Sequence, residues 1–129
     1  MAYPTGSGSE TLFRGSISGQ SNDATAFRWD RTNPTLGVET YTVPALHIIT
    51  VVSIVIANVA AVGTDENFDL YVHDGAANIH LLNAQPLAGA TTFTWNDRIV
   101  LVGGDKLIIV TSNAANVDVL YSFIDQDWS

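Results

Sequence analysis

Apolar and polar side chains alternate with a period of two over much of the chain after residue 37. The clearest runs are NFDLYVHD at 67–74 and VDVLYSFI at 117–124, with shorter ones at 38–43, 79–82, 91–95 and 99–101. This period is typical of half-buried β-strands, and the run KLIIVT at 106–111 is typical of a buried one. Turn signals separate the runs, and no window shows a helical period with caps. The pattern predicts an all-β protein, either an antiparallel sandwich or a barrel.

The longest apolar stretch, VPALHIITVVSIVIANVAAV at 43–62, is about as long as a membrane-spanning helix. Most of its large residues are β-branched, which favours a strand over a helix. No Lys or Arg residue flanks it to set a membrane orientation. We therefore predict a core strand, the longest in the fold, and no membrane partner.

Strict alternation along this strand predicts two faces of different character. One face would hold Ile48, Thr50, Val52, Ile54 and Ile56 and would lie on the core. The opposite face is too apolar for solvent, so we expect another subunit or an arm to cover it, and we favour a subunit. The residues predicted for this oligomer interface are His47, Ile49, Val51, Ser53 and Val55.

The N-terminal residues 1–25 are rich in Gly and Ser, a composition that cannot order itself by burial. They form either a floppy terminus or an arm that becomes ordered on a neighbouring subunit. Alternation from Thr11 to Ile17 predicts a short strand inside this segment. We expect an extended arm at 1–25, followed by one sandwich domain at 26–129. The arm residues expected to contact a partner are Leu12, Phe13, Arg14 and Ile17.

The 129-residue chain has five basic residues, thirteen acidic residues and a net charge of −8. No basic stripe is present to bind phosphates, so nucleic acid is not an expected partner. An anionic membrane surface would also repel the chain. Much of the positive charge lies in the segment FRWDR at 27–31, and we expect Arg28, Trp29 and Arg31 to bind an acidic partner surface. Only 14% of the residues are charged, well below the usual quarter, and a neutral surface of this kind suits packing against neighbours.

The segment GTDENFD at 63–69 contains Asp65, Glu66 and Asp69, whose oxygen atoms are of the kind that binds Ca²⁺. Their spacing does not match the twelve-residue calcium loop, so we expect a solvated acidic turn. The absence of cysteine excludes disulfides, zinc–thiolate sites and cysteine nucleophiles. We therefore expect no cofactor and no metal, with these three carboxylates as the candidates for a metal site.

No motif for catalysis is present. No serine lies in a G-x-S-x-G elbow, and no glycine-rich turn precedes a helix as a phosphate-binding loop would. We expect the three histidines, His47, His73 and His80, to be ordinary strand residues. The aromatic residues leave a second hypothesis open, a stacking platform for a sugar. Its candidates are Tyr71, Trp29, Trp95 and Trp128.

Four segments resemble those of small β-sandwich virion proteins of tailed bacteriophages. They are YTVPA at 41–45, VSIVIAN at 52–58, RIVLVGGDKLIIVTSN at 98–113 and VDVLYSFID at 117–125. The resemblance covers about residues 38–125 and implies a jelly-roll type of sandwich with about eight strands. It also implies a symmetric oligomer, usually a trimer, without catalytic residues. This chain departs from the pattern at Leu46, where the family usually has glycine, so the turn after Pro44 is in doubt.

These observations together predict a non-enzymatic virion structural protein, made in the host cytoplasm and located on the capsid surface or the tail. The favoured role is capsid decoration, in which the protein stabilises the shell like a cement by binding the major capsid protein or another virion protein. The alternatives are a tail- or fibre-associated module and a carbohydrate-binding, receptor-binding module.

Overall fold

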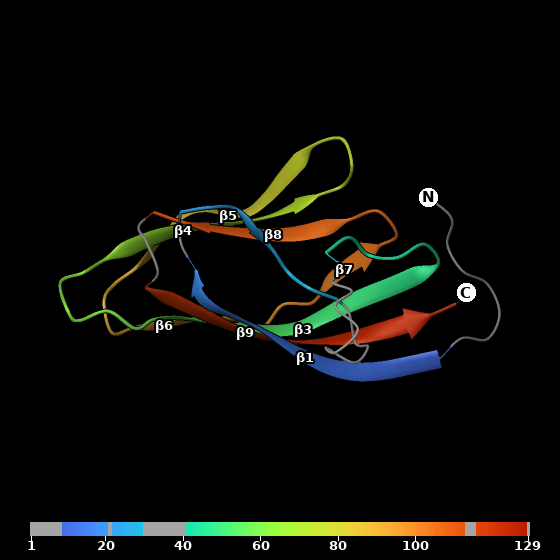
Figure 1. The fold of residues 1–129 in the computed structure, drawn as a ribbon, viewed down its shortest axis with the longest axis horizontal. Coiled ribbons are helices and arrows are strands. Elements are labelled where there is room, and N and C mark those ends of the chain that lie inside the picture. The colour runs from blue at the N-terminus through green and yellow to red at the C-terminus, as the bar shows by residue number, and fades with distance from the viewer. Residues whose placement is uncertain (1–8, 21, 30–40, 113–115, 129) are drawn as a thin grey trace.

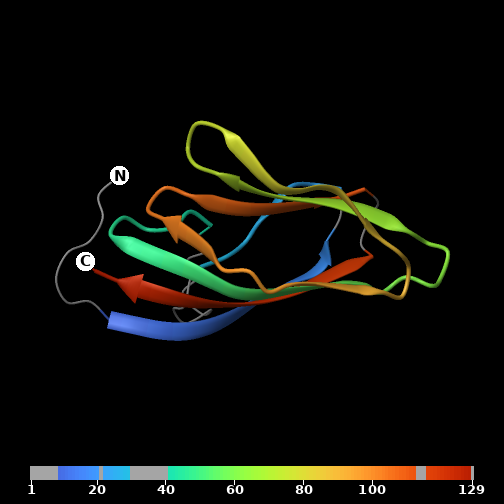
Figure 2. The ribbon, with the colours of Figure 1, turned by 180° about the vertical axis from the view of Figure 1, so that it is seen from behind.

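Two antiparallel sheets packed face to face make up the protein (Figures 1 and 2). The computed structural model describes residues 9–20, 22–29, 41–112 and 116–128, which contain nine strands and no helix. Sheet A consists of β1 (Ser9–Gln20), β9 (Val117–Asp127), β3 (His47–Asn58), β6 (Thr92–Trp95) and β7 (Ile99–Val102). Sheet B consists of β2 (Thr25–Ala26), β8 (Lys106–Thr111), β4 (Glu66–His73) and β5 (Asn78–Leu87). The predicted all-β antiparallel sandwich is confirmed.

The strand pairs are nested along the chain. The innermost pair is β4 with β5 in sheet B, and outside it β3 pairs with β6 and β7 in sheet A. The next pair, β2 with β8, lies in sheet B, and the outermost, β1 with β9, lies in sheet A. Pairs of increasing sequence separation therefore alternate between the two sheets. This arrangement brings the beginning and the end of the described chain side by side in sheet A.

The apolar stretch at 43–62 contains β3, a strand of 12 residues, which only β1 equals in length among the described strands. Within the described chain, no helix is long and apolar enough to cross a membrane. The strict alternation predicted along β3 is wrong, because its register with β9 shifts between Val51 and Ser53. Such a bulge moves the following side chains to the opposite face. Ile49 and Val51 before the bulge are therefore 0% exposed, as is Ile54 after it.

The predicted interface on β3 therefore does not form a single face. Ile49 and Val51 belong to the core of the sandwich, so they cannot contact a second subunit. Ser53 and Val55 follow the bulge and lie on the outer face of sheet A. His47 pairs with Asp127 at the end of β9 and is largely buried there.

The expected division between an arm at 1–25 and a sandwich at 26–129 is wrong for residues 9–20. These residues form β1, which pairs with β9 from Ser9 opposite Asp127 to Ile17 opposite Val119. The alternation predicted for this segment is confirmed, because Phe13 and Ile17 point inward and pack against the core. Gly and Ser residues are ordered here because a neighbouring strand supplies both hydrogen bonds and an apolar surface. The segment is an edge strand of the sandwich itself.

Replacing Gly15 with valine is expected to destabilise the fold by about 1–3 kcal/mol, as overpacking does. A Cβ atom at this position would overlap the ring of Tyr121, which is buried in the core. The matched control is Ser16→Val, because Ser16 is the next residue of β1 and its side chain is exposed. Chemical denaturation of both variants checks the prediction. Equal stability of the two would mean that β1 does not pack on the sandwich.

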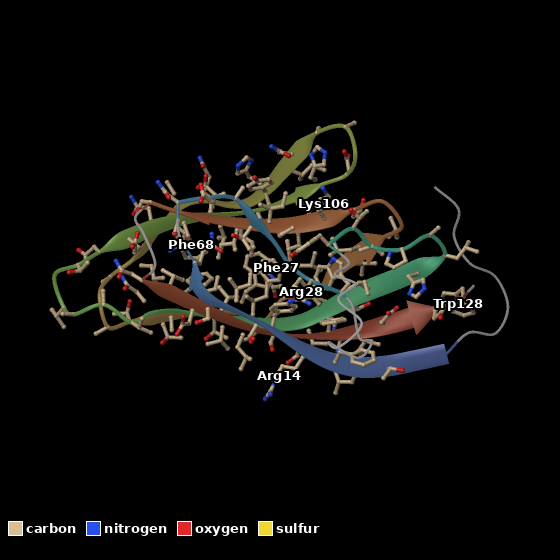
Figure 3. The ribbon with its side chains drawn as sticks, in the orientation of Figure 1. Arg14, Phe27, Arg28, Phe68, Lys106 and Trp128 are labelled. Atoms are coloured by element: carbon tan, nitrogen blue, oxygen red, sulfur yellow. The ribbon has the colours of Figure 1, made fainter. Side chains whose placement is uncertain are left out.

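An aromatic cluster fills the space between the sheets, where Figure 3 shows Phe27 and Phe68. Trp29 is only 2% exposed, and the planes of its indole ring and the Phe123 ring meet edge to face, with 5.1 Å between centroids. The hydroxyl of Tyr121 donates a hydrogen bond to the backbone carbonyl of Arg28 at 2.8 Å and accepts one from the backbone N–H of Arg28 at 2.9 Å. The expectation that Trp29 binds a partner is therefore wrong. Its size and apolar character serve the core, because β2 brings residues 27–29 between the sheets.

Candidate functional site

The outer face of sheet A, which points away from sheet B, is neutral and partly apolar. Leu12 on β1 is 67% exposed there, Val100 on β7 is 62% exposed, and Leu120 on β9 is 43% exposed. Further members are Ile48, Thr50, Ser53, Val55 and Ala57 on β3, Ser122 and Ile124 on β9, and Thr92 and Thr94 on β6. Exposed apolar area of this extent commonly marks a contact with another macromolecule.

Few charges interrupt this face. Among the described residues, it carries only Glu10 and Arg14 on β1 and Asp118 on β9. Figure 3 shows the Arg14 side chain extending away from the sandwich. The face therefore has a formal charge of about −1, whereas the whole chain has a net charge of −8. An apolar partner surface would meet little charge that has to be desolvated.

An open hollow of about 270 Å³ lies on this face, where β1, β9 and β3 run side by side. Among the described residues that line it, Asp118 alone is charged, and its carboxylate already accepts the backbone N–H of Gly19 at 2.8 Å. The hollow offers few polar groups to orient a small ligand, and it suits a protruding apolar side chain of a partner protein. The lining residues are Ser16, Ile17, Ser18, Val55, Ala57, Asp118, Val119 and Leu120.

The acidic residues considered for Ca²⁺ each stabilise a different part of the fold. Asp65 and Asp69 accept backbone N–H groups from residues after β5 and within β5, at 3.0 and 2.6 Å. Glu66 is 2% exposed and accepts hydrogen bonds from the side chains of Ser112 and Asn116 at 2.8 and 3.2 Å. The expectation of a solvated turn is wrong for Glu66. No three metal-binding side chains converge anywhere in the described part of the chain.

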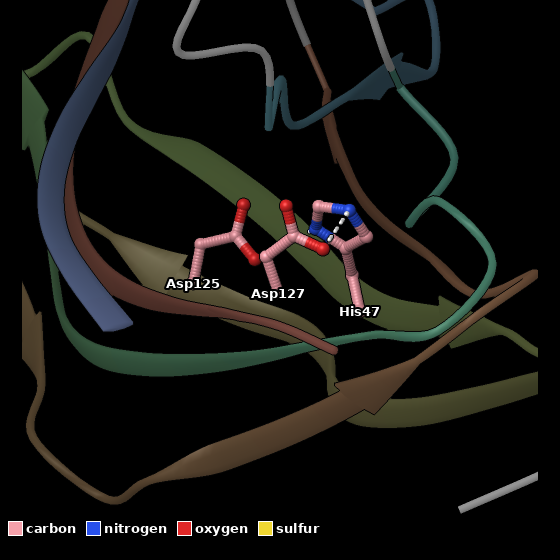
Figure 4. A network of polar contacts seen from close by, with 3 residues as sticks. All are labelled: His47, Asp125 and Asp127. Carbon is pink, nitrogen blue, oxygen red and sulfur yellow. Dashed lines mark hydrogen bonds and ion pairs between the residues drawn. The ribbon is translucent and has the colours of Figure 1, made fainter. Parts of the chain in front are cut away.

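A histidine between two carboxylates closes one end of sheet A (Figure 4). Nδ1 of His47 lies 2.9 Å from Asp125, whose side chain is 2% exposed, and Nε2 lies 3.3 Å from Asp127, whose side chain is 29% exposed. Only the protonated ring can donate from both nitrogens. Because different nitrogens face the two carboxylates, the cluster connects the start of β3 to the end of β9 and does not form a common metal-binding point. Sequence reasoning missed this cluster, since its members are far apart along the chain.

The hairpin between β4 and β5 places the other two histidines on the surface. Nδ1 of His73 lies 2.8 Å from Oδ1 of Asn78. His80 on β5 is paired with Tyr71 on β4. In the turn, Asp74 accepts the backbone N–H groups of two alanines, both at 2.9 Å. These hydrogen bonds hold the pKa of Asp74 below its usual value, because they favour the ionised carboxylate. The hairpin is thus closed by local hydrogen bonds.

The residues predicted for partner binding are distributed over different surfaces. Leu12 and Arg14 from the predicted arm lie with Ser53 and Val55 from the predicted interface on the outer face of sheet A. Arg28 is partly exposed beside the aromatic cluster, and Arg31 lies outside the described residues. Five more predicted contacts pack in or against the core, namely Phe13, Ile17, Ile49, Val51 and Trp29, and His47 is largely buried at the end of sheet A. Pairing between β1 and β9 creates the shared face, and neither segment shows this pairing by itself.

No protein-family model matches this chain, and no curated protein matches it in sequence. Among solved structures, "Structure of infectious bursal disease virus Gx strain" is similar at a TM-score of 0.48 and 10% identity. That match covers 92% of this chain and 34% of the other. "Structure of Eiger TNF from S. frugiperda" is similar at a TM-score of 0.34 and 14% identity, and the match covers 96% of this chain and 87% of the other.

The third structure is "Crystal structure of Podospora anserina GH26-CBM35 beta-(1,4)- mannanase", with a TM-score of 0.36 and 13% identity. The match covers 93% of this chain and 28% of the mannanase chain. In the first and third cases, this chain thus spans about a third or less of the matched one. All three TM-scores are below 0.5, so the function has to be inferred from the residues of this chain.

Proposed function

We propose that this chain is a non-enzymatic virion structural protein that decorates the capsid of a tailed phage and binds the shell through the outer face of sheet A. The observation that carries the proposal is the neutral, partly apolar character of that face. Leu12, Val100 and Leu120 are exposed on it, although the chain as a whole is strongly acidic. A decoration protein stabilises a shell by adding buried area, for which such a face is suited.

The nested strand order supports the jelly-roll type that the family resemblance implies. In a jelly roll, a long antiparallel hairpin is wrapped into two packed sheets. Here the pairs alternate between sheets A and B, from β4 with β5 outward to β1 with β9. The segments that resemble phage virion proteins lie in the loop before β3, in β3 itself, in β7 and β8, and in β9.

Replacing Leu120 with aspartate should weaken binding to the shell about tenfold, because it places a charge at the centre of an apolar contact. The measurement is co-sedimentation of the purified protein with empty shells of the phage that encodes it. The matched control is Ile79→Asp, since Ile79 on β5 is also strongly exposed, at 51%, but belongs to sheet B. Wild-type protein that stays in the supernatant would refute the decoration role. Equal losses from both variants would refute the assignment to sheet A.

A carbohydrate-binding module is the second candidate. The rings of Tyr71 and His80 lie 4.9 Å apart on the hairpin of β4 and β5, with His80 exposed. Paired rings of this kind can support the face of a sugar. Trp29, the largest aromatic candidate, is in the core and does not contribute. A glycan array with wild-type protein and the Tyr71→Ala variant tests this function, and an array without signal would exclude it.

A further inference from the structure

We propose that two copies of this chain associate by pairing their β1 strands antiparallel, edge to edge, about a two-fold axis at Leu12. The two copies of sheet A would then form one continuous sheet. This inference concerns the contact between copies. It does not depend on the proposed function, which concerns the contact between the protein and a shell.

The first reason for this pairing is that the outer edge of β1 is available to a further strand. Among the described strands, only β9 pairs with β1, so one edge of this 12-residue strand has no described partner strand. The other sheet edges are short or irregular. Strands β2, β6 and β7 have only two to four residues, while β5 contains Pro86, a positive φ of 51° at Ala84 and shifted registers with β4. Such features protect edges against pairing. Strand β1 contains no proline, and its own register shift and positive φ lie at its end, between Ile17 and Gln20, away from Leu12.

The charges on β1 select both the partner and the register. Glu10 and Arg14 are the only charged residues of the strand, and both are exposed on the outer face of sheet A. Neither forms an ion pair with another described residue. An antiparallel pair centred on Leu12 places Glu10 of each copy opposite Arg14 of the other, so that two opposite-charge pairs form. Cross-strand pairs of opposite charge stabilise a sheet, whereas directly opposed like charges destabilise it.

Neighbouring registers lack this match. A pair centred on Glu10 would oppose the two glutamates, and a pair centred on Arg14 would oppose the two arginines. The register centred on Leu12 also brings the two copies of that leucine together, and its side chain is 67% exposed in the single chain. Edge pairing would therefore cover the most exposed apolar side chain of β1.

The mass of the protein in solution, measured by sedimentation over a wide concentration range, tests the pairing. We expect a concentration-dependent dimer, and we expect Glu10→Arg or Arg14→Glu alone to weaken it on the order of tenfold. The double variant restores opposite charges and should dimerise like the wild type. Matched controls are Asp97→Arg and Arg98→Glu, which make the same changes in net charge at exposed positions between β6 and β7 and should leave dimerisation unchanged.

The register is tested by cysteine cross-linking, which is selective because the chain has no cysteine of its own. Leu12→Cys places two thiols opposite each other at the axis, within reach of a disulfide, and should cross-link under oxidation. Ser16→Cys on the same face should not, because its counterpart would lie far along the antiparallel strand. A monomer at all concentrations, a trimer, or a dimer insensitive to both charge reversals would overturn the proposal. If a monomeric charge variant still binds the shell, the contact between copies and the contact with the shell are separate, so either proposal can fail without the other.

Discussion

Replacing Trp29 with alanine is expected to lower the free energy of unfolding by about 3–5 kcal/mol, the range observed for large aromatic residues in cores. The indole ring is 2% exposed and lies edge-on to the rings of Tyr121 and Phe123, at centroid distances of 5.8 and 5.1 Å. A surface residue that served only to bind a partner would change stability by no more than about 0.5 kcal/mol. Denaturation by urea, followed by circular dichroism, distinguishes the two roles.

Two further variants sharpen this experiment. Trp29→Phe should cost clearly less than Trp29→Ala, because Nε1 makes no hydrogen bond within the described chain and an aromatic ring would still fill the space. Trp128→Ala is the control of the same residue type, since Trp128 is only partly buried and lies outside the core cluster. It should cost about 1 kcal/mol or less. Similar losses for Trp29→Ala and Trp128→Ala would contradict the core assignment.

The strands with one face on the core were predictable from the sequence. In β4, residues Phe68 and Leu70 are buried, and in β9 the inward positions from Val117 to Phe123 are buried, as period-two patterning predicts. The error in β3 has a physical cause. A bulge needs one additional residue in one strand, and the uninterrupted β-branched run gives no local sign of its position near Val52.

The assignment of residues 1–25 to an arm rests on their Gly- and Ser-rich composition, although the alternation from Thr11 to Ile17 already predicts a strand within them. Gly15 suggests a flexible arm when the segment is viewed by itself, but in the fold the ring of Tyr121 occupies the space that a side chain would need. The partner strand lies at the other end of the chain, so local sequence cannot reveal the pairing. The neutral outer face of sheet A could not be predicted for the same reason, since it forms only when β1, β9 and β3 lie side by side.

Two of the segments on which the resemblance rests, YTVPA at 41–45 and RIVLVGGDKLIIVTSN at 98–113, are joined by backbone hydrogen bonds. The amide of Val43 in YTVPA donates to the carbonyl of Asp105 at 2.9 Å, and the amide of Gly104 donates back to the carbonyl of Val43 at 3.0 Å. Leu46, where the resemblance leads us to expect glycine, has a φ of 62°, a conformation that glycine adopts without strain. The side-chain amide of Asn58, at the end of VSIVIAN, donates to two backbone carbonyls. These residues specify the fold, so partner contacts must be sought on its surfaces.

Replacing His47 with alanine is expected to lower the free energy of unfolding by about 3 kcal/mol, because it removes a donor from a buried carboxylate. The side chain of Asp125 is 2% exposed and lies 2.9 Å from Nδ1 of His47. Asp127→Asn is the matched control, since this carboxylate is 29% exposed and 3.3 Å from Nε2. Its loss should be below about 1 kcal/mol, as for most exposed ion pairs.

A double-mutant cycle with Asp125→Asn separates the contact between His47 and Asp125 from other effects of the substitutions. His47→Ala alone leaves a negative charge in the interior without this partner, whereas the double variant removes the charge as well. The double variant should therefore be more stable than the sum of the two single losses implies, by about 1–3 kcal/mol. Additive losses in urea denaturation would show that the two side chains stabilise the end of sheet A independently. A measurable coupling would mean that they join the start of β3 to the end of β9 as one unit.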